Sequence, residues 1–118
     1  MRSKDAERDE RIENEIIVDC YGELEQMIGW HCYLDDILQF PFKATCISQR
    51  TISPLQVGEA VKVVGMADQN DCFHEMFVQV EWKKRKLSVP LAQLQPSDKS
   101  NEERNEAIAD WKYWSKQA

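Results

Sequence analysis

The sequence feature that most constrains the fold is the change of hydrophobic pattern at Pro41. Before this proline, apolar residues recur at spacings of three and four, which is the period of an amphipathic helix. After it, apolar and polar residues alternate over short runs, which is the period of a half-buried strand. Because proline disfavours helical geometry at the residue before it, the helical region is predicted to end near residue 40.

The amino-terminal region contains two helical patterns. The first begins near Asp9 and ends before Gly29, which we interpret as a carboxy-terminal helix cap. Its apolar positions are Ile12, Ile16, Ile17, Cys20, Tyr21, Leu24, Met27 and Ile28. The second pattern is shorter and runs from Trp30 to Leu38. Residues 1–7 show no period, and we predict that they are frayed.

The middle of the chain is predicted to form strands. Alternating runs occur in FKATCIS (42–48), EAVKVVGMA (59–67), MFVQVEW (76–82) and LSVPL (87–91), and AQLQP (92–96) is typical of a closing turn. Four or five short strands joined by turns such as KKRK favour a small, bent antiparallel barrel of the SH3-like kind.

A third helix is expected after the barrel. Ser100 or Asn101, followed by Glu103, is a helix-capping signal, and apolar residues with helical spacing follow it. We therefore predict an α+β fold in a single domain, 1–118. Its parts would be a helical region (9–40), a small barrel (42–96) and a carboxy-terminal helix (101–115).

Acidic residues are concentrated in the amino-terminal third. Residues 1–40 hold eleven Asp and Glu against four Lys and Arg, within a chain whose net charge is −6. Such a region repels nucleic acid and anionic lipid, and it favours cations or basic partners. The basic WKKRK turn (82–86) is interpreted as a solubilising tip of a hairpin, and with a pI near 4.9 we expect no nucleic-acid partner.

Two groups of carboxylates lie in the helical region. Glu15, Asp19 and Glu23 are spaced by four, so a continuous helix would stack them on one face. Like charges at this spacing repel one another, and a divalent cation would reverse that cost; a solvated acidic face is the alternative. Asp35 and Asp36 are adjacent on the second helix, where they diverge by roughly 100° and are unsuited to share one ion. One of them could be a ligand, or both could be solvated.

The segment GMADQNDCFHEMF (65–77) combines candidate oxygen donors for a metal. These are Asp68, Asn70, Asp71 and Glu75. Calcium binds six to eight oxygens, but the EF-hand template fails here at Cys72, Phe73 and Gln79. Zinc is the competing metal, with Cys72 and His74 as one pair and His31 and Cys32 as a second. Structural zinc ligands usually come in CxxC-like pairs, so a core cysteine and a surface histidine are the preferred interpretation.

Several phrases, taken in order, resemble a known family. They are GWHCYLDDILQFPFKA, ISPLQVGEAVKVVGMA, DCFHEMFVQVEW, LSVPLAQLQP and EAIADWKYW. Over roughly residues 12–114 the chain is similar to the cyanobacterial calcium-binding proteins of the CcbP type. The resemblance implies an acidic, cytosolic calcium binder without EF-hands that becomes more compact with the ion. Its candidate ligands within the matching phrases are Asp35, Asp36, Asp68, Asp71 and Glu75, and further candidates are Asn70, Asp19 and Glu23.

We therefore predict a non-enzymatic protein that binds Ca²⁺ reversibly through clustered surface carboxylates and buffers or senses free calcium in the cytoplasm. Its expected partners are calcium ions and a regulatory protein, with no membrane and no nucleic acid. A metal-free barrel adaptor for a protein or nucleic acid and a zinc-stabilised domain are the alternatives. No nucleophile, base and stabiliser converge in the sequence, so catalysis is not expected.

Overall fold

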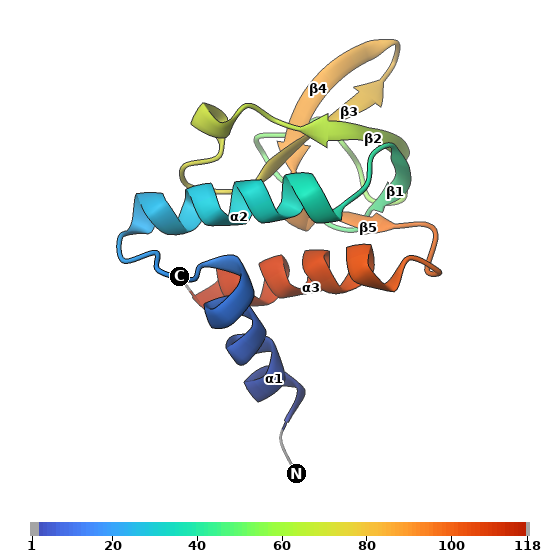
Figure 1. Ribbon diagram of the computed structural model, residues 1–118. Helices are drawn as coiled ribbons and strands as arrows, with labels where there is room; N and C mark the ends of the chain where they lie inside the picture. The colour runs from blue at the N-terminus through green and yellow to red at the C-terminus, as the bar shows by residue number, and fades with distance from the viewer. Residues whose placement is uncertain (1–2, 118) are drawn as a thin grey trace.

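The computed structural model describes residues 3–117, and within that range three α-helices lie on one side of a five-stranded antiparallel sheet (Figure 1). The helices are α1 (Lys4–Arg11), α2 (Glu23–Ile37) and α3 (Glu102–Gln117). The strands are β1 (Phe42–Cys46), β2 (Ala60–Met66), β3 (Phe77–Trp82), β4 (Arg85–Pro90) and β5 (Leu94–Pro96). Three single-turn elements complete the order: the π-helix η1 (Ile12–Ile16) and the 3-10 helices η2 (Gln69–Asp71) and η3 (Leu91–Gln93). The α+β class is confirmed.

The amino-terminal helix differs from the prediction at both ends. It begins at Lys4, where the side chain of Ser3 accepts a hydrogen bond from Ala6 N, so residues 4–7 are helical and not frayed. It ends in η1, after which Asp19 adopts a left-handed φ of 58°. The predicted continuous helix over 9–28 is therefore wrong, because the chain turns at residues 17–22 before α2 begins.

Helix α2 joins the two segments that the sequence assigns to separate helices. Gly29 lies inside it and is not a cap. A Cβ at Gly29 would stand 2.9 Å from the backbone oxygen of Ile16, so the missing side chain lets α2 approach η1 closely. Trp30 and Leu34 on the inner face are fully buried.

The sheet follows the predicted strand runs. Its order is β4-β3-β2-β1-β5, with neighbouring strands antiparallel throughout. The basic turn joins β3 to β4 through Lys83 and Lys84, which have φ values of 49° and 66°, the left-handed geometry that tight hairpins favour. No pairing joins β4 to β5 within residues 3–117, so the sheet is open and not a closed barrel.

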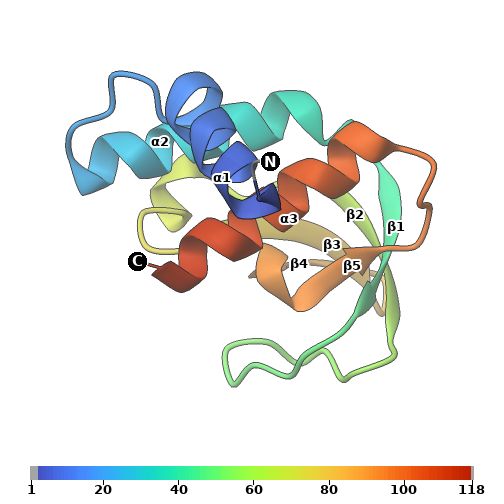
Figure 2. The same cartoon turned by 90° about the horizontal axis from the view of Figure 1, so that it is seen from below.

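The core lies between the sheet and the helices, which lie on one side of the sheet in the view from below (Figure 2). Trp30 of α2 and Trp111 of α3 meet there with ring centroids 5.3 Å apart. The inward-facing valines Val63, Val78, Val80 and Val89 are all 0% exposed.

The predicted cap of the last helix is Asn101, whose side-chain oxygen accepts a hydrogen bond from Arg104 N at 3.0 Å. No helix within the described residues is long and apolar enough to cross a membrane.

Candidate functional site

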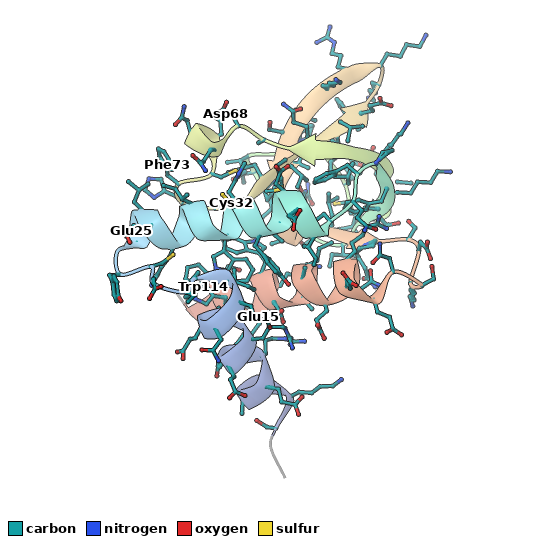
Figure 3. The ribbon with its side chains drawn as sticks, in the orientation of Figure 1. Glu15, Glu25, Cys32, Asp68, Phe73 and Trp114 are labelled. Atoms are coloured by element: carbon teal, nitrogen blue, oxygen red, sulfur yellow. The ribbon has the colours of Figure 1, made fainter. Side chains whose placement is uncertain are left out.

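The acidic segment between β2 and β3 lies beside α2 (Figures 1 and 3). The contact that fixes this placement joins Nε2 of His31, on α2, to the backbone oxygen of Ala67, at 2.8 Å. Ala67 directly precedes Asp68, and Figure 3 shows Asp68 on the side of the segment away from the helix. The structure thus joins one predicted acidic segment to the helix that carries another.

Local hydrogen bonds give the segment a defined shape. Asp68 caps η2, because its Oδ1 accepts a hydrogen bond from Asn70 N at 2.9 Å. Cys72 follows at 1% exposure, and its Sγ accepts a hydrogen bond from Phe77 N at 3.4 Å. The buried cysteine anchors the segment, so that Asp68, Asn70 and Asp71 stay exposed at its tip.

The predicted acidic residues differ in whether they already have partners. Asp35 and Asp36 are exposed on α2, and neither side chain makes a hydrogen bond or ion pair with any described residue. Glu75 is different, because its two oxygens accept hydrogen bonds from the guanidinium of Arg50 at 2.7 and 2.8 Å. Calcium at Glu75 would have to displace this guanidinium.

The predicted column of Glu15, Asp19 and Glu23 does not form. Glu15 lies in η1, Asp19 in the following turn and Glu23 at the start of α2, so the three do not share one helix face. The cause is local: the left-handed φ of Asp19 ends the helical path that the spacing of four assumed. The hydroxyl of Tyr21 contacts Oδ1 of Asp19 at 3.5 Å instead.

Metal ligands are not preassembled. No group of three or more His, Cys, Asp or Glu side chains is placed to hold a metal in the described part of the chain. The zinc set is separated: His31 contacts Ala67, Cys72 is buried against Phe77, and Cys32 and His74 are exposed. Gln79, the last position of the EF-hand template, lies inside β3. Carboxylate and amide oxygens on this surface have the chemistry that calcium requires, but they are not held in a closed set.

Sequence reasoning misses two residues that shape this region. The sequence suggests His31 as a zinc ligand, yet in the structure it fastens α2 to the β2–β3 connection. Nothing in the sequence singles out Arg50, yet its guanidinium forms an ion pair with the carboxylate of Glu75. The sequence separations are 36 and 25 residues, and no local motif signals contacts of that range.

Comparison with known proteins identifies the family. A family model for CcbP-type proteins, described as calcium binding, matches residues 10–115. The chain belongs to this family. It is a calcium-binding protein, and the prediction of Ca²⁺ as its ligand is confirmed.

Solved structures agree with this membership. CcbP from Anabaena is 35% identical, with a TM-score of 0.82, and the match covers 96% of this chain and 92% of that chain. A calcium-binding protein in its calcium-binding form is also 35% identical, with a TM-score of 0.83, and the match covers 99% and 97% of the two chains. A search of curated proteins found no match.

Proposed function

We propose that this member of the family binds Ca²⁺ reversibly through exposed carboxylates outside any EF-hand loop, and that it buffers or senses free calcium without catalysing a reaction. The observation that carries the proposal is the 2.8 Å contact between His31 Nε2 and Ala67 O. It fastens an acidic segment with available oxygen donors to the acidic helix α2.

The principal candidate ligands are Asn70 and Asp71 on the segment and Asp35 or Asp36 on α2. Asp68 is a further candidate, but it faces away from the helix and its Oδ1 already accepts a hydrogen bond from Asn70 N. Asp35 follows His31 by one helical turn, so it lies on the helix face that carries the contact to Ala67. Calcium takes six to eight oxygens, and backbone carbonyls and water regularly complete such a set. Only one of the two adjacent aspartates can point toward the segment.

A second candidate pair is Asp19 with Glu23. Both lie where the turn leads into α2, and the amino-terminal end of a helix does not favour cations. Glu75 is the least available candidate because of its pairing with Arg50.

The separation of the ligands determines the kind of binding that we expect. Carboxylates held apart by mutual repulsion must come together around the ion, which costs conformational freedom and lowers affinity relative to a rigid site. Calcium supplies the positive charge that removes this repulsion. The β2–β3 segment and α2 then approach each other, so the bound protein is more compact. A moderate affinity of this kind suits the buffering or sensing of a fluctuating ion.

Two finer features belong to the same proposal. The strand order and the 3-10 turn η3 between β4 and β5 support an open, SH3-like arrangement of the sheet. All four cysteines, which lie within residues 3–117, are free, and this supports a reducing, cytoplasmic location.

The test is calorimetric titration of wild type, Asp35→Asn and Asp71→Asn with Ca²⁺ at physiological ionic strength. We expect saturable heat that Mg²⁺ does not reproduce, and an affinity lowered by about tenfold in at least one variant, since removing a carboxylate removes a ligand charge. Glu102→Gln removes an exposed carboxylate from the start of α3 and is the matched control. Unchanged affinity in both aspartate variants would overturn the site assignment, while absence of saturable heat in wild type would overturn the function.

A further inference from the structure

A surface outside the principal calcium candidates combines exposed apolar side chains with unbalanced negative charge. It lies where the turn of residues 17–22 enters α2. Val18, Tyr21 and Leu24 are 53%, 88% and 52% exposed, which is unusual for large apolar residues so close together in the chain. We call these three residues the apolar tip.

A hollow lies next to the apolar tip. Its volume is about 490 Å³, and it is lined by Glu23, Gln26, Met27, His74, Trp111, Trp114 and Ser115. The apolar part of this lining comes from α2 and α3, which face each other there. Leu24 precedes Met27 by three residues on α2, so the tip and the wall of the hollow are neighbours on one helix surface. Figure 3 shows Glu25 at the outer end of α2 and Trp114 on the adjacent part of α3.

Charge around the apolar tip has one sign. Residues 12–25 contain five Asp and Glu and no Lys or Arg. Asp19, Glu23 and Glu25 lie among the residues of the apolar tip, and all three are exposed. A partner that covers the tip must therefore bring positive charge to its rim.

A neighbouring hollow limits where that positive charge can lie. It has a volume of about 530 Å³, shares His74, Trp111 and Ser115 with the first, and is bordered by Lys112, Lys116 and the ion pair of Arg50 with Glu75. Lysine or arginine residues of a partner would be repelled on that side. The basic residues are thus expected over α2 and an apolar residue over Trp114.

We propose that the apolar tip and its adjacent hollow form a docking surface for a basic amphipathic segment of another protein. One apolar side chain of the segment fills the hollow, others cover Tyr21 and Leu24, and Lys or Arg side chains face Asp19, Glu23 and Glu25. In such an interface, a few side chains buried in a hollow with aromatic walls supply most of the binding free energy. The charged residues around the hollow determine which partner binds. This inference does not depend on calcium binding.

The second exposed apolar group of the molecule offers a matched control. Ile52 and Val57, in the β1–β2 connection, are 56% and 64% exposed. The connection, residues 47–59, contains one arginine and one acidic residue, Glu59, so this group lacks the three exposed carboxylates of the apolar tip. A basic segment should therefore prefer the apolar tip.

The experiment is a fluorescence-anisotropy titration with a labelled amphipathic peptide of leucine and lysine, with a leucine–glutamate peptide of the same pattern as the charge control. A calcium chelator is present throughout, so failure of the calcium proposal would not affect the result. We expect saturable binding of the lysine peptide only. Tyr21→Ser with Leu24→Ser should weaken it by about tenfold, since these side chains supply the apolar contact. Ile52→Ser should leave it unchanged.

Glu25→Gln keeps the test falsifiable if the double variant unfolds. It removes one exposed charge, and the glutamine keeps a side-chain oxygen that can accept the hydrogen bond from Tyr21 N at 3.3 Å. It should weaken binding by about twofold or more and reduce its salt dependence. The proposal is overturned if the lysine peptide does not saturate, if the glutamate peptide binds equally, or if the variants bind as wild type does. Sedimentation provides a further outcome that would overturn the proposal. If wild type is a dimer and the double variant Tyr21→Ser with Leu24→Ser is a monomer, the surface binds a second copy of this chain.

Discussion

At the scale of single residues, the role of a side chain depends on partners that lie far away in the sequence. By composition, Glu75 and Asp71 are equivalent oxygen donors. In the structure, Arg50 donates two hydrogen bonds to Glu75, whereas the side chain of Asp71 has no partner among the described residues. The pair is partly exposed, so its contribution to stability is modest, but it leaves Asp71 as the more available donor.

The cysteines provide a residue-scale test of burial. Cys72 is 1% exposed and burial raises the pKa of its thiol, whereas Cys32 is exposed. Because the thiolate is the reactive species, a raised pKa lowers the reactive fraction at neutral pH. We expect iodoacetamide to modify Cys32 at least about tenfold faster than Cys72 in the native protein, as measured by mass spectrometry of peptides.

The rate of iodoacetamide modification of Cys72 is also expected to rise with pH. The rate of modification at Cys72 should keep rising at a pH where an ordinary cysteine, with a pKa of about 8.5, is already ionised. In urea the two cysteines should react at similar rates, which is the control. Equal rates in the native protein would contradict the burial of Cys72.

At the scale of elements, the packing of α2 against η1 depends on Gly29. A glycine inside a helix normally costs about 1 kcal/mol relative to alanine, so helix propensity alone favours replacing it. The backbone oxygen of Ile16, which would lie 2.9 Å from the Cβ of an alanine at this position, opposes that gain. Backbone atoms cannot move aside as a flexible side chain can, so we expect the steric cost to exceed the propensity gain.

Gly29→Ala is therefore predicted to destabilise the fold by about 1–3 kcal/mol, which is the usual cost of overpacking. Urea unfolding of the variant and wild type measures it. Gly65→Ala is the control, because a Cβ there meets nothing within 4 Å, and we expect a change of less than about 1 kcal/mol. A more stable Gly29→Ala variant would show that α2 and η1 can separate without cost.

These elements also show how far sequence reasoning reaches. Strands β1 to β3 are predictable because each buries one face, so burial imposes a period of two that is visible locally. The break between η1 and α2 is not predictable in this way, because the apolar residues keep their helical spacing across it. It is set by the left-handed turn at Asp19, a local conformation that the apolar spacing does not signal, and by the close approach at Gly29, which is a tertiary contact. The individual acidic segments are identifiable from the sequence, but their proximity depends on the contact of His31 with Ala67.

At the scale of the whole molecule, the two ends of the chain are joined by one buried carboxylate. Asp110 of α3 is 0% exposed and accepts hydrogen bonds from Arg8 at 2.7 Å and from Arg11 at 2.8 and 2.9 Å. Its hydrogen bond and negative charge raise the pKa of the Arg11 guanidinium. Helix α1 contains no buried residue, so polar contacts of this kind hold it against α3.

Asp110→Asn should therefore loosen α1 more than the rest of the fold. The asparagine keeps one acceptor oxygen but leaves two arginines without their buried countercharge, and we expect a loss of about 2–3 kcal/mol. This is below the full cost of breaking a buried pair, because the arginine side chains are 23% exposed. Hydrogen exchange should accelerate first in residues 4–11, while β2 and β3 stay protected.

Asp9→Asn is the control for this effect. Asp9 is exposed and accepts a hydrogen bond from the Tyr113 hydroxyl at 2.9 Å, so it joins the same two helices without a buried charge. We expect its free energy of unfolding to change by less than about 1 kcal/mol. If Asp110→Asn lowered global stability but left exchange in residues 4–11 unchanged, α1 would be held by contacts other than this carboxylate. If exchange rose there alone, α1 would be a separately detachable element whose position depends on Asp110.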